Sequence, residues 1–319
     1  MSQWSQFFPP KPHFTLESVG SQDGKVFIVT GATSGLGFEL AKMLYRRNGR
    51  VYITARSNEK GEKAINAIRS AVPDSSGSLS FLHLELDDLS GIKSSVEVFK
   101  TQESKLHVLF NNAGVSQPPL GSASKQGIEL QLATNCLGPF LFTQLLLPLL
   151  EATAKDSSRG SVRVVWTGSQ IVELSAPPSG LVMAEVHNPP KDKTRNYVNS
   201  KTGNMFLASE LARRSKDVVS VSLNPGAANT NLFRHTRLLG VFARPLMYSP
   251  NLAAHTELFA GLSGEITLEQ NGCYVVPFGR ISKDVRKDLV EAMKGGDEGG
   301  TGRAKEFWEW CEMMTGKYV

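Results

Sequence analysis

The sequence predicts an α/β fold in which a doubly wound parallel sheet is covered by helices. Apolar, β-branched runs alternate with helical patterns over most of the chain. Such alternation indicates parallel strands joined by crossover helices. A glycine-rich turn follows the first strand, and no linker divides the 319 residues. We therefore expect a single domain with a lid segment and a C-terminal extension.

The expected elements follow one another in a regular order. Strands are predicted at residues 26–29, 51–54, 80–84, 108–110, 162–166 and 218–223. Helices are predicted at residues 38–44, 59–71, 90–105, 131–150 and 198–214, with a last short helix ending at Cys311. The apolar run from Cys136 to Leu150 contains Gln144 and two prolines. It is too short to span a bilayer and predicts a buried helix.

Composition excludes several classes of partner. The 35 basic and 30 acidic residues leave a net charge of +5, and the basic residues are scattered among acids. This pattern argues against nucleic-acid binding. The three cysteines show no metal-ligand spacing and no disulfide framework. With a polar, proline-rich start in place of a signal peptide, we expect a cytoplasmic protein with no metal and no transmembrane segment.

The domain layout has a core and two flanking segments. Residues 1–24 form an arm with neither helical nor strand periodicity, expected to be extended and docked on its own domain; a partner or membrane contact is the alternative. Residues 25–292 are the predicted main domain, with an insertion at 171–196 and a lid at about 231–262. Residues 293–319 form a tail, with a mobile loop at 295–300 before its short helix.

The glycine-rich turn at residues 30–37 predicts a dinucleotide site. It follows an apolar strand and opens a helix, so phosphates would meet free N–H groups at the positive helix end. Gly31 suits the tight turn, Gly35 lets the backbone approach a pyrophosphate, and Gly37 lets helix and strand pack closely. The expected cofactor contacts here are Gly31, Thr33, Ser34, Gly35, Leu36 and Gly37.

The end of the second predicted strand distinguishes the two nicotinamide dinucleotides. An acid about twenty residues after the glycine turn would bind the ribose 2′-hydroxyl. Here the sequence has Arg56 and Ser57, with no acid until Glu59. A permanently charged fork of donors suits a 2′-phosphate, so we predict NADP(H). The alternative is that Arg56 is a solvated residue at the strand end.

Three motifs together resemble the short-chain dehydrogenase/reductase family. They are the glycine turn at 30–37, the Asn-Asn-Ala-Gly segment at 111–114, and Tyr197 followed by Lys201 four residues later. The resemblance covers roughly residues 25–279. The basic residue after the second strand looks like retinol-dehydrogenase-like members, and the arm and the Trp-Glu-Trp end look like fungal reductases of that branch.

The resemblance implies a Rossmann-like domain that transfers hydride reversibly between a nicotinamide and a carbonyl or alcohol. The catalytic positions that it implies are Asn135, Ser169, Tyr197 and Lys201. Further cofactor contacts that it implies are Glu85, Leu86, Asn112, Ala113, Gly114, Tyr197, Lys201, Pro225, Gly226 and Thr230. Two positions depart from the family pattern: Ser34 stands where many NADP-dependent relatives have Arg or Lys, and Glu85 stands where relatives usually have Asp.

The chemistry needs these residue types. Reduction of a ketone places negative charge on its oxygen and requires a proton, which Tyr197 could supply if its pKa moved toward neutrality. Lys201, one helical turn on, would favour the phenolate. Ser169 would hydrogen-bond the substrate oxygen, and by resemblance Asn135 orders a water linked to Lys201. A tyrosine and a lysine four apart also occur by chance on helices.

Apolar segments on the substrate side suggest a lipophilic small molecule, such as a steroid-, retinoid- or polyketide-like ketone of secondary metabolism. In the insertion these residues are Leu174, Leu181, Val182 and Met183, and the segment after Thr230 is similarly apolar. An alternative function is a sensor that binds NADP(H) without turnover. The helices at 131–150 and around Tyr197 are a candidate homo-oligomer interface. The tail near Trp308 is a candidate cap over the pocket or over a partner subunit.

Overall fold

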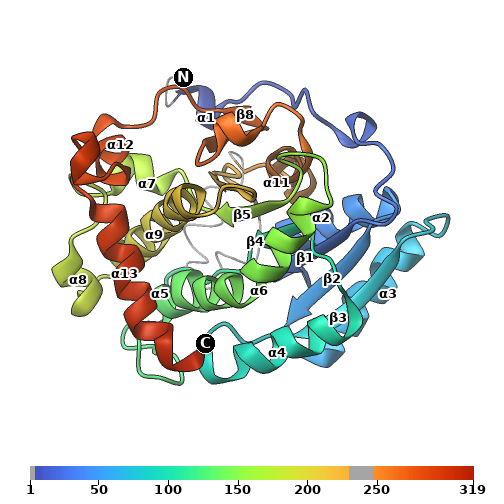
Figure 1. Ribbon diagram of the computed structural model, residues 1–319, viewed down its shortest axis with the longest axis horizontal. Coiled ribbons are helices and arrows are strands. Elements are labelled where there is room, and N and C mark those ends of the chain that lie inside the picture. The colour runs from blue at the N-terminus through green and yellow to red at the C-terminus, as the bar shows by residue number, and fades with distance from the viewer. Residues whose placement is uncertain (1–3, 230–246) are drawn as a thin grey trace.

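The computed structural model describes residues 4–229 and 247–319 and confirms the predicted doubly wound α/β fold. One eight-stranded sheet has the order β3-β2-β1-β4-β5-β6-β7-β8 (Figure 1). Its strands pair in parallel except for β7 with β8. The strands are β1 (Val26–Thr30), β2 (Arg50–Ala55), β3 (Ser78–His83), β4 (Val108–Asn111), β5 (Arg163–Thr167), β6 (Val219–Leu223), β7 (Tyr274–Val276) and β8 (Arg280–Ile281).

Helices cover both faces of the sheet. One face carries α2 (Gly35–Arg46), α3 (Asn58–Ala71) and α11 (Pro250–Leu262). The other carries α4 (Leu89–Gln102), α6 (Gly138–Lys155) and α9 (Lys193–Arg214), with α13 (Arg303–Thr315) against α9 (Figure 1). Shorter helices are α1 (Trp4–Phe7), α5 (Leu130–Leu132), α7 (Ile171–Ser175), α8 (Met183–His187) and α12 (Lys287–Met293). The central strands β1, β4, β5 and β6 are buried throughout, which explains their continuous apolar runs.

The strand order places the predicted motifs at one edge of the sheet. From β1 the chain first adds strands on one side of the sheet (β2 and β3) and then, from β4 onward, on the other side. At such a switch point the connections leave the two neighbouring strands in opposite directions, which opens a crevice at the carboxyl ends of β1 and β4. Thr30 at the end of β1 donates to the carbonyl of Phe110 in β4 at 3.1 Å. Gly168, after β5, donates to the carbonyl of Leu223 in β6 at 2.8 Å. The loops after all four strands therefore meet at this crevice.

Capping residues set where helices α9 and α4 begin. Helix α9 begins at Lys193, five positions before the predicted start, because the Asp192 carboxylate accepts hydrogen bonds from the N–H groups of Thr194 and Arg195. Asp88 caps α4 in the same way, and α4 ends at Gln102 where the prediction ran to residue 105. The short strands β7 and β8 were not predicted, since three or two residues carry too little periodicity.

The predicted helix at 131–150 is interrupted by a π-helical turn, Ala133–Leu137, between α5 and α6. Within the described parts of the chain, one helical stretch, Leu130–Lys155, is long and apolar enough to cross a membrane. Of its most apolar window, 72% is buried inside the fold. Its side chains pack in the same core cluster as α4 and α9, so this stretch is a core helix.

The flanking segments contain more regular structure than expected. The arm is not wholly extended, since it contains α1 and a 3₁₀ turn at Leu16–Ser18. The expected mobile loop holds a 3₁₀ turn, Gly296–Glu298, whose Glu298 binds Arg213 at 2.6 Å. The tail helix does not cap the pocket, because Trp308 and Trp310 are buried in the core.

The lid and the insertion also differ from expectation. The last part of the expected lid is α11, a buried helix against the sheet, while residues 230–246 lie outside the described residues. Within the insertion, Leu181 and Met183 belong to the main hydrophobic core. Only the tertiary structure shows which apolar residues of such a segment face inward, because both core and pocket walls select the same residue types.

Candidate active site

A cavity of about 1040 Å³ opens at the carboxyl edge of the sheet. It extends from the glycine turn and Arg56 at one end to Ser169 and Tyr197 at the other. The predicted residues that line it are Gly31, Thr33, Ser34, Gly35, Leu36, Arg56, Ser57, Leu86, Asn112, Ala113, Gly114, Ser169, Tyr197, Lys201, Pro225 and Gly226. Residues far apart in the sequence thus form one continuous site.

The glycine turn closes tightly against the end of β4. Gly31 has a φ of +67°, and a Cβ there would lie 2.9 Å from the Cα of Ala113. A Cβ on Gly37 would lie 2.5 Å from the Asn112 amide nitrogen and 3.0 Å from the Cα of Ala32. Gly37 therefore lies behind the cavity lining and lets α2 pack closely against the glycine turn and the loop after β4.

The Asn-Asn-Ala-Gly segment is held to the same turn. The Asn112 amide donates to the carbonyl of Thr30 at 2.7 Å, and the Ala113 N–H donates to the Thr30 hydroxyl at 2.9 Å. Through these bonds Thr30 joins the segment to β1. The cavity wall formed by residues 112–114 is therefore held in shape by hydrogen bonds to Thr30.

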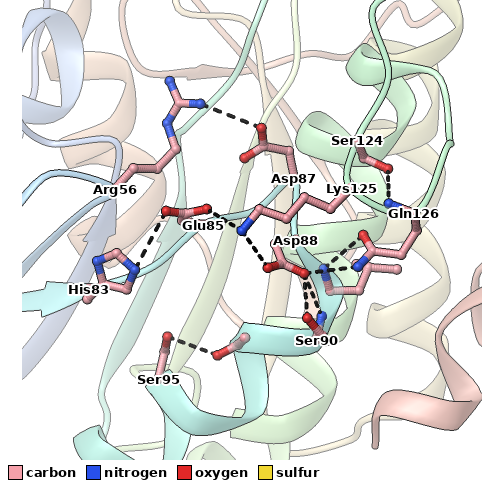
Figure 2. A network of polar contacts seen from close by, with 12 residues as sticks. Arg56, His83, Glu85, Asp87, Asp88, Ser90, Ser95, Ser124, Lys125 and Gln126 are labelled. Atoms are coloured by element: carbon pink, nitrogen blue, oxygen red, sulfur yellow. Dashed lines mark hydrogen bonds and ion pairs between the residues drawn. The ribbon is translucent and has the colours of Figure 1, made fainter.

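The end of the cavity near β2 and β3 is charged (Figure 2). Arg56 approaches the Asp87 carboxylate at 3.5 Å, and its side chain is 61% exposed. Glu85 is paired with Lys125 at 3.3 Å and with His83 at 3.8 Å. Asp87 lines the cavity, whereas Glu85 is absent from the described residues that do so. Glu85 thus forms ion pairs beside the cavity, and Asp87 lines it. The Glu85 contact with a cofactor stays a prediction.

Two lysines of α3 were missed by the sequence reasoning. Lys60 and Lys63 line the cavity beside Arg56. Ser57 caps α3 by accepting a hydrogen bond from the Lys60 N–H at 3.3 Å. The first two turns of α3 therefore add two basic residues to the cavity lining. An N-cap serine followed by lysines three and six residues later is the signal that could have found them.

The three predicted catalytic side chains at the other end share one wall. Ser169 follows β5, while Tyr197 and Lys201 lie one turn apart on α9. The Lys201 ammonium lies 5.9 Å from the Tyr197 ring centroid and donates to the Thr167 carbonyl at 2.8 Å. This arrangement brings a hydroxyl, a phenol and an ammonium to one end of the cavity.

Burial controls the acid–base properties of this wall. It raises the pKa of Tyr197 to about 12, and a hydrogen bond with Ser169 only partly offsets the rise. Burial lowers the pKa of Lys201 to about 8, although the charges of Cys136 and Glu257 act to raise it. Burial is therefore the largest effect on the Tyr197 pKa. The expected lowering of this pKa by Lys201 together with an oxidised nicotinamide stays a prediction.

Asn135 lies behind the cavity wall in the π-helical turn. Its carbonyl oxygen accepts from the Val115 N–H at 2.8 Å, and its amide donates to the Val115 carbonyl at 3.0 Å and the Ser200 hydroxyl at 2.9 Å. A Cβ on Gly114 would be 3.2 Å from the Asn135 Oδ1 and 3.4 Å from the Lys201 Nζ. Gly114 thus separates Asn135 from the cavity and allows its approach to Lys201.

A buried carboxyl under Lys201 was not predicted. Glu257 in α11 is 0% exposed, and its Oε1 accepts from the Thr167 hydroxyl at 2.6 Å. The carbonyl of the same threonine accepts from Lys201. Burial raises the pKa of Glu257 to about 7, with Thr167 and Lys201 opposing the rise. A single acid in an otherwise apolar helix is the sequence signal that marks it.

The remaining walls come from α7 and from the loop after β6. Ile171 and Leu174 of α7 line the cavity next to Ser169. Pro225 and Gly226 line it on the other side, where the Gly226 N–H donates to the Asn224 Oδ1 at 2.9 Å. The predicted contact Thr230 lies outside the described residues. In the ranges 4–229 and 247–319, no group of three metal-ligating side chains occurs.

Comparisons with known proteins agree with this geometry. The family model described as short chain dehydrogenase matches residues 25–178. Short-chain dehydrogenase/reductase iacJ of Pestalotiopsis fici is 46% identical, over 99% of this chain and 98% of that protein. Short-chain dehydrogenase/reductase pkfC of Emericella nidulans is 42% identical, over 97% of this chain and 98% of that protein. The retinol-dehydrogenase-like branch stays a prediction.

Solved structures show the same fold. The Pseudomonas aeruginosa RhlG/NADP active-site complex aligns with a TM-score of 0.62 at 24% identity, over 81% of this chain and 96% of that one. The 3-ketoacyl-(acyl-carrier-protein) reductase of Brucella melitensis, complexed with NADH, aligns with a TM-score of 0.63 at 21% identity, over 81% and 98%. From the near full-length relatives, this chain belongs to the short-chain dehydrogenase/reductase family, a class of oxidoreductases that use a nicotinamide cofactor.

Proposed function

We propose that this protein is an NADP(H)-dependent oxidoreductase that interconverts a ketone or aldehyde and an alcohol on a lipophilic small molecule. The observation that carries the proposal is the shared cavity: Ser169, Tyr197 and Lys201 line it together with the glycine turn. A dinucleotide that rests on the turn can reach these side chains within the same cavity. The sensor alternative gains no support from the site, because binding alone needs no such set of groups.

The cavity fits a nicotinamide dinucleotide. Glycines at 31 and 37 leave no room for a Cβ where the turn meets β4, and the helix N-terminus of α2 faces the cavity. Gly31, Ser34, Gly35 and Leu36 would hold the pyrophosphate, and the segment at 112–114 would support the adenosine half. Lys201 and the loop at 225–226 would hold the nicotinamide half. When bound, the cofactor supplies or accepts the hydride.

The chain's own residues handle the proton. In the reductive direction, the Ser169 hydroxyl donates a hydrogen bond to the substrate carbonyl oxygen. Tyr197 gives its proton to the same oxygen as the carbonyl carbon receives hydride, which leaves a phenolate and an alcohol. The Lys201 ammonium favours that phenolate, and an oxidised nicotinamide adds positive field beside it. Glu257, which is joined to Lys201 through Thr167, acts to raise the pKa of the ammonium.

The preference for NADP(H) rests on the cations at the β2 end. Arg56, Lys60 and Lys63 face the cavity against one acid, Asp87. A 2′-phosphate would meet this net positive charge and the planar donors of Arg56. The solved neighbours with NADP and with NADH do not separate the two cofactors.

The substrate proposal rests on the wall beyond Ser169. Ile171 and Leu174 present apolar surface there, and Leu174 is 50% exposed. Steroid-, retinoid- or polyketide-like ketones fit such a wall. We further propose a catalytic domain over residues 25–292 in a cytoplasmic protein, a location supported by three free cysteines.

The test is NADPH consumption against a panel of lipophilic ketones, with NADH in parallel. We expect turnover with NADPH that falls about 10²–10⁴-fold in Tyr197→Phe, since the proton donor is lost. Tyr318→Phe, at the far end of the chain, is the matched control and should keep full activity. Faster turnover with NADH would overturn the NADP(H) assignment alone. Cofactor binding without turnover of any ketone would favour the sensor alternative.

A further inference from the structure

The N-terminal arm carries an unusual distribution of polar and apolar side chains. In α1, Trp4 is 69% exposed and Phe7 is 43% exposed, while Gln6 between them is 1% exposed. Hydrophobicity alone would bury the aromatic side chains and expose the amide. A buried amide is costly unless its hydrogen bonds are made. The hydrogen bonds of Gln6 therefore determine how the arm docks.

Gln6 bridges two segments that line the active-site cavity. Its Nε2 donates to the Glu173 carboxylate at 2.7 Å, and its Oε1 accepts from the Asn224 amide at 3.0 Å. Both partners are buried, with 5% and 1% exposure. Glu173 belongs to α7, and Asn224 comes directly after β6. One side chain thus links two walls of the cavity.

Each partner lies next to residues that face the cavity. Glu173 sits between Ile171 and Leu174, which both line it. Asn224 lines the cavity itself and orients the following turn through its Oδ1, which accepts from the Gly226 N–H. A shift of either partner therefore moves cavity-lining atoms.

Two more bonds hold the arm at this end of the molecule. Arg280 of β8 donates to the Ser5 carbonyl at 2.8 Å, and the Tyr248 hydroxyl donates to the Phe7 carbonyl at 2.7 Å. Figure 1 shows the first helix lying beside β8, far from the C-terminal end of the chain. The backbone on either side of Gln6 is thus anchored, which holds the Gln6 side-chain amide in one orientation.

We propose that Gln6 is a positioning residue of the active site, which sets the spacing between α7 and the loop after β6 and so shapes the substrate end of the cavity. This inference rests on the proposed function for its kinetic consequence. Its structural part, a clamp between two walls, stands independently. In this view the arm belongs to the catalytic unit, although its sequence precedes the Rossmann-like domain.

The first experiment is hydrogen–deuterium exchange on the full chain, which needs no substrate. In Gln6→Ala we expect amides at 171–176 and 224–229 to exchange roughly tenfold faster, since two buried bonds are lost. Amides at 58–71 in α3 should not change. Gln22→Ala is the matched control, because the Gln22 side chain donates to the carbonyls of Gly20 and Ser21 within the arm. Unchanged exchange in Gln6→Ala would overturn the clamp, whatever the activity.

A pair of charge-swapped variants separates the clamp from general damage to the fold. Gln6→Glu places a second carboxylate against Glu173 and should speed exchange more than Gln6→Ala does. In the double variant Gln6→Glu/Glu173→Gln, the amide at position 173 can donate to the carboxylate at position 6. The other oxygen of that carboxylate can accept the hydrogen bond from Asn224. We expect the double variant to return exchange to within about threefold of the wild type. A double variant no better than Gln6→Glu would contradict the proposal.

Kinetics with whichever ketone the panel identifies complete the test. In Gln6→Ala we expect the ketone KM to rise roughly tenfold, with kcat and the NADPH Kd within about threefold, since most cofactor contacts lie elsewhere. An unchanged ketone KM despite faster exchange would overturn the positioning role. Faster exchange in a protein that reduces no ketone would leave the clamp standing and count against the proposed function instead.

Discussion

At the scale of single residues, the site depends on groups buried behind the cavity wall. Thr167 connects two of them, because its carbonyl accepts from Lys201 and its hydroxyl donates to Glu257. When a buried carboxyl lies near a buried ammonium, the free energy of the folded state depends on whether each group is charged. Glu257 therefore links the pH dependence of stability to the active site.

Glu257 gives a pH prediction with a definite sign. Its pKa rises from 4.5 to about 7 in the folded state, so the folded protein keeps a proton that the unfolded chain has lost between these values. Its contribution is fully present below pH 4.5 and is lost as pH rises through 7. We expect Glu257→Gln to match the wild type at pH 4 and to exceed its free energy of unfolding by about 3 kcal/mol at pH 8.

The measurement is urea unfolding of both proteins at several pH values. Burial lowers the pKa of His107 to about 4, so this residue also makes stability depend on pH. Because both proteins contain His107, its contribution cancels when the two curves are compared. Parallel stability curves from pH 5 to 8 would contradict the burial argument for Glu257.

At the scale of elements, the tail helix is part of the core. The Trp308 ring meets Phe140 of α6 edge-on at 4.9 Å, and the Arg214 guanidinium of α9 lies 4.7 Å from its centroid. Its indole N–H donates to Glu312 at 2.7 Å. The helix considered as a candidate cap over the pocket or a partner subunit thus packs against α6 and α9. Helix α9 carries Tyr197 and Lys201.

Truncation of this side chain should destabilise the protein without altering the cavity. Trp308 is 2% exposed, so we expect Trp308→Ala to lower the free energy of unfolding by about 3–5 kcal/mol. Met313→Ala, in the same helix but 67% exposed, is the control and should change it by less than about 0.5 kcal/mol. Denaturant unfolding measures both. A Trp308→Ala protein as stable as the control would show that the tail helix does not contribute to the core.

At the scale of the whole molecule, the sheet order assembles the site. Loops after β1, β4, β5 and β6 meet at one edge because the strands pair in parallel in that order. A cofactor in the cavity would therefore contact segments from both halves of the sheet. Its binding should stabilise the whole fold, and its 2′-phosphate should add to this effect through Arg56.

Thermal unfolding with cofactor tests this expectation. NADPH at a hundred times its Kd contributes about 2.7 kcal/mol, which corresponds to roughly 4 °C in Tm for a chain of 319 residues. We expect a smaller shift with NADH at equal concentration. In Arg56→Ala the NADPH shift should drop to the NADH value, while Arg46→Ala, on the surface of α2, keeps it. Equal shifts with both cofactors in the wild type would contradict the NADP(H) assignment.

The sequence by itself determined the fold class, the order of strands and helices as far as β6, and the family. It also predicted the residues that line most of the cavity, including Tyr197 and Lys201. Glycine turns, apolar periodicity and a helical spacing of four are local patterns, encoded within a few neighbouring residues. Their consequences at the sheet edge follow from the general rules of parallel α/β folds.

Only the tertiary structure decided which distant residues meet. Gln6 lies 218 positions from Asn224, and Glu257 lies 90 positions from Thr167, so no local pattern joins them. The same holds for Asp87 facing the cavity in place of Glu85, and for Trp308 in the core. Burial and long-range hydrogen bonding select among residues of similar type, and this selection depends on which elements pack together.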